Sequence, residues 1–305
     1  MNSTNICFTT EDMALFSTAS HDRNPLHVSH VYARATPYGE PVVFGILGAL
    51  AALSHLPDRS DMVLREVSLE FRNPMTVGVD YAIHVSDMMP LRSSVKIYDA
   101  DRLMMKATFT FLAKQGHWEG LVASEHPYPT EAADRKKEDF LVGRRIAGNY
   151  CPSTRDFDKV VERWGLSVKS AKVTQIVSMM WTSFMVGMEL PGKRAIYWRL
   201  ALEFRCEDGQ SEGPLDYEVR IEEFDERLDL LHTAGDLSVE GKVWGKAHMW
   251  AFVRRDSPQP SVAKLSSLMP RSDQLKGKVA LVVGGSRGLV RQSARLSYCK
   301  GARFL

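Results

Sequence analysis

One pattern of elements occurs twice in this chain of 305 residues. Each copy has a long apolar segment, a Leu-Pro pair, a strand-like run containing Leu-Glu-Phe-Arg, and a later run beginning Asp-Tyr. Residues 67–72 align with residues 200–205 at an offset of 133 (200 − 67). The Asp-Tyr pair at 80–81 returns at 216–217, at an offset of 136 (216 − 80). Because these features recur in one order, the sequence predicts a tandem duplication of an α+β unit.

Each copy predicts a buried helix followed by an antiparallel sheet. The apolar segments at 43–56 and 173–192 are hydrophobic on nearly every side, which is typical of helices that are buried all round. The runs that follow alternate apolar and polar residues, as in a sheet with one covered face. They cover 62–74, 79–89, 93–101 and 103–114 in the first copy, and 195–206, 216–225, 227–236 and 239–255 in the second.

The two copies differ in the segment that precedes the helix. The first contains the loop Asp22-Arg23-Asn24-Pro25-Leu26-His27, which Pro25 keeps from being helical throughout. A carboxylate and an imidazole that converge from a bent loop can deprotonate a water and later return a proton. The corresponding region of the second copy, 153–172, has acids but no histidine. Only the first copy is therefore predicted to carry chemistry of this kind.

The start of the first buried helix could complement that loop. Backbone N–H groups near Phe44 and Gly45 would stabilise negative charge on a carbonyl oxygen, and glycine would let a thioester approach closely. Together these features predict hydration of an α,β-unsaturated thioester, or the reverse dehydration. The structural alternatives are an Asx-type turn with a surface histidine, and glycines (Gly45 and Gly48) that only permit helix–sheet packing.

These residues resemble the signature of the MaoC-like (R)-specific enoyl-CoA hydratases and dehydratases. The matching positions are residues 22–27, Tyr32-Ala33, Gly39, Pro41 and residues 43–45. Phe44 departs from the pattern, because many members have histidine there. The resemblance covers about residues 1–255 and implies a double hot dog fold, with two antiparallel sheets that each wrap around a long central helix.

The resemblance also implies a reaction and roles for individual residues. Asp22 and His27 would be the catalytic pair that activates water, Asn24 would support the loop at the substrate site, and the Gly45 amide would contribute to the oxyanion hole. The reaction would be the reversible hydration of trans-2-enoyl thioesters to (R)-3-hydroxyacyl thioesters, without a metal or redox cofactor. The substrate would be an acyl-CoA or an acyl-carrier-protein thioester.

Two alternatives to an enoyl-CoA hydratase stay open at this point. One is a 3-hydroxyacyl-carrier-protein dehydratase of fatty-acid or polyketide assembly. The other, of a different class, is a non-catalytic acyl-thioester binding module, in which the loop around Asp22 and His27 is only structural.

The end of the chain changes in character. Residues 275–305 resemble the start of a short-chain dehydrogenase/reductase, with an apolar run followed by the turn Gly284-Gly285-Ser286-Arg287-Gly288-Leu289. This predicts a Rossmann-like βα fragment. Val290 stands where a third glycine is usual, and too little chain follows for the catalytic Tyr-x-x-x-Lys. We therefore expect either a truncated reductase start or a degenerate remnant of a hydratase–reductase fusion, and NADP binding only where a complete reductase domain is present.

Four domains are predicted from these patterns. They are a catalytic hot dog domain at 1–125, a second hot dog domain without the catalytic loop at 126–255, a linker at 256–274, and the reductase start at 275–305.

Composition argues against several other classes of protein. The net charge of +2 gives no electrostatic case for nucleic-acid or membrane binding. The four cysteines form no CxxC pair, which disfavours a metal site or a disulfide framework and fits a reducing compartment. No apolar run approaches the roughly 18 residues of a membrane span, and the N-terminus does not resemble a signal peptide. We expect a cytoplasmic enzyme that is either a monomer or a homodimer of double hot dog units.

Overall fold

The computed structural model describes residues 4–58, 61–113, 127–166, 171–205, 214–255, 267, 272–281 and 303–304. The chain divides into two units, Met1–Arg254 and Arg255–Leu305. The predicted boundary between residues 125 and 126 falls outside the described ranges and stays a prediction, as does most of the predicted linker.

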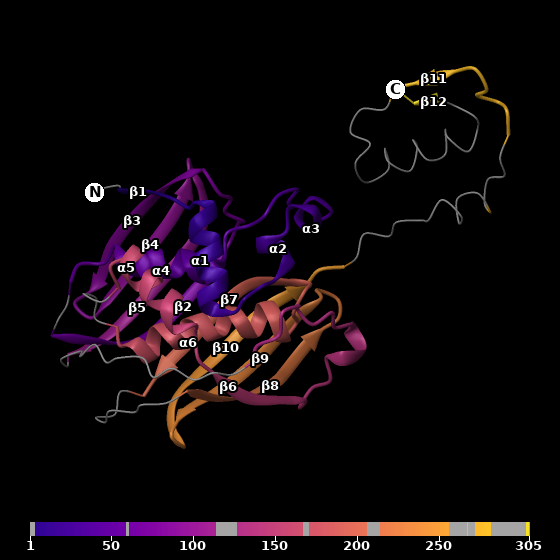
Figure 1. The fold of residues 1–305 in the computed structure, drawn as a ribbon. Helices are drawn as coiled ribbons and strands as arrows, with labels where there is room; N and C mark the ends of the chain where they lie inside the picture. Colours follow the sequence, from indigo (N-terminus) through magenta and orange to yellow (C-terminus); the bar gives the residue numbers. More distant parts are fainter. Residues whose placement is uncertain are drawn as a thin grey trace. The chain divides into compact units, whose positions relative to one another are not determined.

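Ten strands of the first unit form one antiparallel sheet (Figure 1). Their order across the sheet is β1-β3-β4-β5-β2-β7-β10-β9-β8-β6. The strands of the first half are β1 (Thr4–Cys7), β2 (Met62–Phe71), β3 (Asp80–Met89), β4 (Arg92–Asp99) and β5 (Arg102–Ala113). Those of the second half are β6 (Arg145–Tyr150), β7 (Ala195–Phe204), β8 (Leu215–Asp225), β9 (Leu230–Val239) and β10 (Lys242–Val253).

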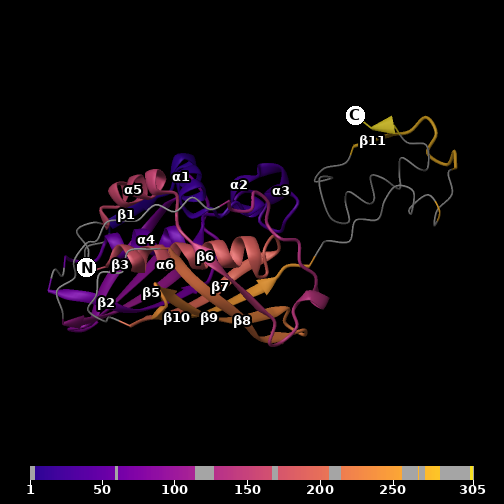
Figure 2. The same cartoon turned by 60° about the horizontal axis from the view of Figure 1, so that its bottom comes forward.

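The helices of this unit lie on one face of the sheet (Figure 2). In the first half they are α1 (Thr10–Ser20), α2 (Pro25–Val28), α3 (His30–Arg34) and α4 (Gly45–Ser54). In the second half they are the short 3-10 helix η1 (Lys137–Asp139), α5 (Thr154–Arg163), α6 (Val173–Phe184) and the π-helical segment η3 (Met185–Glu189). The second apolar segment was predicted as a single helix, but its last turn has the wider π-helical winding.

The predicted duplication is visible in the strand order. Read from the two edges inward, β1-β3-β4-β5-β2 matches β6-β8-β9-β10-β7, strand for strand. The edge strands β1 and β6 were not predicted, because each is short and lacks a long alternating pattern. Both halves therefore have five strands and one central helix, α4 or α6, and the fold is a double hot dog.

The two halves meet along one continuous hydrogen-bonded edge. Strand β2 pairs with β7 in antiparallel register, and Ser68 lies opposite Ala201. These two residues are equivalent in the repeat, since 201 − 68 gives the same offset of 133 that aligns the two sequences. An approximate twofold axis thus passes through this pair. The expectation of two separate sheets was wrong, because pairing of the two inner edges joins them into a single ten-stranded sheet.

The core explains why the two apolar segments became the central helices. Every residue of α4 from Ile46 to Leu53 is buried, as is nearly all of α6. Burying a large aliphatic side chain contributes about 1.5–3 kcal/mol, so a helix that is apolar all round is stable only inside such a wrapped sheet. Within the described ranges, no helix combines the length and apolar character needed to cross a bilayer.

The second unit has one short described pairing. Strand β11 (Val279–Ala280) pairs in parallel with β12 (Arg303–Phe304). The predicted glycine-rich turn at 284–289 lies outside the described residues. The Rossmann-like fragment and the resemblance to a reductase therefore stay predictions.

Candidate active site

The loop singled out in the sequence begins where α1 ends. His21 closes α1 in the left-handed conformation, with a φ of 57°, and this turns the chain sharply inward. Asp22 follows at 1% exposure. Asn24 then caps α2, and its side chain accepts a hydrogen bond from the Leu26 N–H while Pro25 occupies the first helical position.

Asp22 is a buried carboxyl group without a cationic partner among its described contacts. Its Oδ2 accepts a hydrogen bond from Ser183 Oγ at 2.7 Å, and its Oδ1 accepts one from the Asn24 N–H at 3.1 Å. Burial raises the pKa of Asp22 from 3.8 to about 7, while these two hydrogen bonds act to lower it. Near neutral pH this carboxyl group can therefore either give or take a proton.

His27 is held in one tautomer by the backbone. Its Nδ1 lies 2.6 Å from the carbonyl oxygen of Val42. Because a carbonyl can only accept, Nδ1 carries the proton and Nε2 keeps its lone pair. Burial lowers the pKa of His27 to about 4, although the bond to Val42 acts to raise it. His27 is thus a neutral base over the physiological pH range.

Phe44, the residue that departs from the family pattern, packs directly against this base. Its ring centroid lies 4.1 Å from that of His27 and 4.9 Å from that of Phe16. Phe44 also precedes α4, and its side chain makes no capping hydrogen bond. It therefore fixes the imidazole plane by aromatic contact and leaves the N–H groups at the start of α4 uncapped.

Gly45 begins α4 and lines the same pocket. A Cβ at this position would lie 2.7 Å from Cε1 of Phe71, so glycine is required for the helix to approach that ring. The structure therefore places the predicted oxyanion-hole residue beside the predicted catalytic pair.

Asn24 ties the loop to the other half of the molecule. Its Nδ2 donates to the carbonyl oxygens of Gly187 at 2.8 Å and Gly192 at 3.0 Å. Both amide protons are used in these bonds, which supports the predicted role of Asn24 in holding the loop.

The second half also contributes residues that were not predicted as part of the site. Ser183, at the end of α6, hydrogen-bonds Asp22, and Gly187 in η3 packs against the same carboxyl group. A Cβ at Gly187 would lie 2.6 Å from Oδ2 of Asp22 and closer still to Oδ1. Both residues are more than 160 positions from Asp22 in the sequence. The one signal that pointed to them was the twofold repeat, which brings the second central helix close to the first loop.

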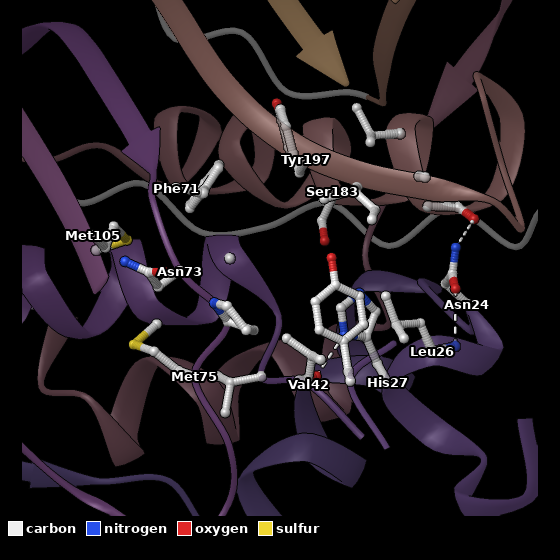
Figure 3. Close-up of a pocket in the computed structure, with 18 of the residues that line it drawn as sticks. Asn24, Leu26, His27, Val42, Phe71, Asn73, Met75, Met105, Ser183 and Tyr197 are labelled. Carbon is white, nitrogen blue, oxygen red and sulfur yellow. Dashed lines mark hydrogen bonds between the residues drawn. The ribbon is translucent and has the colours of Figure 1, made fainter. Parts of the chain in front are cut away.

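The pocket that these residues share has a volume of about 140 Å³. Figure 3 shows His27 and Ser183 at one side, with Phe71, Met75 and Met105 at the other. The full lining combines the polar residues of the loop with apolar residues of both halves: Asp22, Asn24, Leu26, His27, Tyr38, Val42, Val43, Gly45, Phe71, Arg72, Asn73, Pro74, Met75, Met104, Met105, Ser183, Val186, Gly187, Ala195, Ile196 and Tyr197. An acid and a base thus face a small, mainly apolar cavity.

Comparison with known proteins finds a family match in the half that carries the Asp22–His27 loop. Residues 2–88 match the family model for the MaoC like domain. A 3-hydroxybutyryl-CoA dehydratase of Methylorubrum extorquens is 28% identical over 92 residues, which is 28% of this chain and 58% of that relative. The chain therefore spans less than two thirds of this relative's length.

Solved structures show the same fold at low sequence identity. A MaoC-like dehydratase superposes with a TM-score of 0.59 and 13% identity, covering 83% of this chain and 97% of its own. A conserved hypothetical protein of Mycobacterium tuberculosis, described as having a double hotdog fold, gives 0.57 and 13%, covering 82% and 93%. Residues 2–88 thus match the MaoC like domain, and these structures share the double hot dog architecture of the first unit.

Proposed function

We propose that this protein is a hydro-lyase that interconverts trans-2-enoyl thioesters and (R)-3-hydroxyacyl thioesters. One observation carries the proposal: the buried Asp22 and the neutral His27 line one pocket with Gly45 at the start of α4. That combination of an acid, a base and uncapped backbone N–H groups suits addition of water across a conjugated double bond.

The proton transfers can be assigned to these groups. In hydration, Nε2 of His27 takes a proton from water as the water oxygen bonds to Cβ of the enoyl group. The electron pair of the double bond moves toward the thioester, and the N–H of Gly45 stabilises the negative oxygen. Protonated Asp22 then gives its proton to Cα. Transfer of the proton from His27 to Asp22 through the next bound water restores both groups, and dehydration is the reverse.

The size of the cavity favours a short acyl group. An apolar protein cavity of about 150 Å³ can hold benzene, so a volume of about 140 Å³ suits a chain of roughly four to six carbons. The matched relative from Methylorubrum extorquens carries the name 3-hydroxybutyryl-CoA dehydratase, which also favours a four-carbon CoA thioester over long-chain carrier-protein substrates.

The test is hydration of crotonyl-CoA, followed by loss of the absorbance of its conjugated enoyl thioester. The stereochemistry is then read with dehydrogenases specific for (R)- or (S)-3-hydroxybutyryl-CoA. Turnover to the (R) product is the expected result. Binding of crotonyl-CoA without turnover would instead favour the non-catalytic binding module, and the (S) product would contradict the proposed (R) specificity.

A further inference from the structure

A group of positive charges lies beside the pocket and takes no part in the proposed proton transfers. Lys193 and Arg194 directly precede the pocket-lining Ala195, and the Arg254 N–H donates to the carbonyl oxygen of Arg194 at 2.9 Å. One carboxylate, Asp134, lies 2.9 Å from Arg194 Nε and 3.9 Å from Lys193 Nζ. The carboxylate of Asp134 is therefore nearer to Arg194 than to Lys193.

The ring of Tyr32 in α3 holds two of these cations together. The guanidinium carbon of Arg254 lies 5.1 Å from its centroid, and Nζ of Lys193 lies 5.7 Å from it. The Tyr32 hydroxyl accepts a hydrogen bond from Arg254 Nη2 and donates one to the carbonyl oxygen of Lys193 at 3.0 Å. Cation–π contact therefore keeps two like charges near each other, where an anion would be attracted.

Arg254 retains an unused hydrogen-bond donor. Its Nε is buried and has no hydrogen-bond partner among the described residues. Leaving a buried donor of a charged group unpaired is costly, so such a group calls for an acceptor. The planar guanidinium group of arginine can donate two parallel hydrogen bonds to the oxygens of a phosphate. A charged phosphate therefore binds it more strongly than a neutral acceptor would.

Tyr38 connects this group of charges to the reaction pocket. It lines the pocket, and the positive charge of Arg254 acts against the rise in the pKa of Tyr38 that burial causes. Arg254 is thus close enough to Tyr38 for its positive charge to act on a residue that lines the pocket.

We propose that Arg254 and Lys193 bind a phosphate group of the substrate's pantetheine carrier. This inference rests on the proposed function, because the thioester substrate brings the carrier. The phosphate is common to CoA and to the prosthetic group of an acyl-carrier protein, so the same two cations would serve either source. They would raise affinity without taking part in the chemical step.

The test compares three crotonyl thioesters: crotonyl-CoA, crotonyl-acyl-carrier protein and crotonyl-pantetheine, which has no phosphate. Arg254→Met is expected to raise KM about tenfold for the two phosphate-bearing substrates, to leave kcat within about twofold, and to leave KM for crotonyl-pantetheine unchanged. Lys193→Met should raise the same KM values about threefold. It removes only the ammonium group and keeps the carbonyl that Tyr32 binds, so it tests the site if Arg254→Met misfolds.

Arg227→Met is the matched control, because Arg227 is an exposed arginine of the β8–β9 turn, 89% accessible, and its loss changes the net charge equally. An equal rise in KM for all three thioesters, or none in either variant, would overturn the phosphate site. If the wild-type protein turns over none of them, the proposed function fails. Calorimetric titration with CoA then decides the inference, since equal affinities of wild type and both variants would overturn it. The lower KM between CoA and carrier protein identifies the natural source of the phosphate.

Discussion

The two halves of the duplicated unit have the same strands in the same order, yet their central helices begin and end differently. Helix α4 begins at Gly45, which lines the pocket, and its cap residue Phe44 makes no side-chain capping bond. At the start of α6, the side chain of Gln175 accepts a hydrogen bond from the Lys172 N–H at 2.8 Å. The cap residue of each helix makes no side-chain capping bond, but only α4 contributes its first residue to the pocket, whereas α6 contributes Ser183 near its end.

At their C-terminal ends, it is the second helix that reaches the site. Helix α4 stops at Ser54, but the second helix continues beyond α6 as η3, which brings Gly187 against Asp22. The first half therefore supplies the acid and the base, and the second half holds the acid in place. The comparison teaches that the copy without the Asp22–His27 loop is more than a scaffold, because its residues form a supporting wall of the pocket in the other copy.

The comparison predicts that acid–base chemistry depends on the first half alone. Asp22→Asn and His27→Gln should each lower kcat about 10²–10⁴-fold, because each removes a group that transfers a proton. The control is His232→Gln in β9 of the second half, which should leave kcat within about twofold. A loss of less than tenfold in both site variants, measured with crotonyl-CoA, would contradict the assignment.

Asp22→Asn, which should lower kcat, should raise the free energy of unfolding. The pKa of Asp22 is raised from 3.8 to about 7 by burial, so the folded protein binds the proton more tightly than the unfolded chain. Stability is therefore lost as the pH rises between these values. At pH 8 Asp22→Asn should gain up to about 4 kcal/mol, and this gain should shrink toward pH 4.

Urea unfolding at the two pH values measures this effect. Asp12→Asn provides the contrast, because Asp12 is equally buried but its Oδ1 lies 2.8 Å from Arg163 Nε. Removal of that charge should destabilise the protein. An effect of Asp22→Asn on the free energy of unfolding that does not change with pH would show that burial does not set the proton affinity of Asp22. A gain in stability for Asp12→Asn as well would mean that the gain is not specific to a buried carboxyl group without a cationic partner.

The contribution of the second half is tested by Gly187→Ala. The added Cβ would overlap the Asp22 carboxyl group, and displacement of a catalytic group by about 1 Å can lower the rate about 10²-fold. Gly48→Ala in α4 is the matched glycine of the first half, since its Cβ would lie 2.7 Å from the flexible end of Met75 and no closer than 3.5 Å to Met105. Its kcat should stay within about threefold. Equal rates for the two variants would show that η3 does not support the site.

The smallest effect should come from Ser183→Ala and appear in the pH profile. With His27 neutral above about 4 and Asp22 protonated below about 7, kcat/KM should be bell-shaped between these values. Because the Ser183 hydroxyl stabilises the carboxylate, its removal should raise the pKa of Asp22. The alkaline limb should then move up by about one pH unit.

Ser178→Ala is the control within the same helix. Its hydroxyl donates to the carbonyl oxygen of Thr174 at 2.6 Å and so makes no contact with Asp22. If the alkaline limb of the pH profile moves equally in both variants, the shift comes from a general disturbance of α6. It would then not come from loss of the Ser183–Asp22 hydrogen bond.

The sequence was most informative where local patterns repeat. The offset of 133 predicted the duplication and both central helices, and the loop pattern selected Asp22 and His27, which the structure places in one pocket. The pairing of β2 with β7 was missed, because strand alternation reveals which face of a strand is buried but says nothing of its lateral neighbour.

The residues that support the site were missed for a related reason. Ser183 and Gly187 lie in an apolar run that reads as ordinary core, and their importance comes only from a partner far away in the sequence. Phe44 likewise appeared as an unexplained departure, since a tilted ring contact with His27 leaves no spacing signature. Contacts between the two halves can be predicted only when the position of the twofold axis in the structure is known.

The pairing of Ser68 with Ala201 has a consequence for the behaviour of the protein on dilution. Where two identical subunits build a site across their interface, the fraction assembled depends on protomer concentration. Here the two partners are joined by the chain, so the wall that supports Asp22 forms in a unimolecular step. Specific activity should therefore stay constant across dilutions that would dissociate a weak dimer.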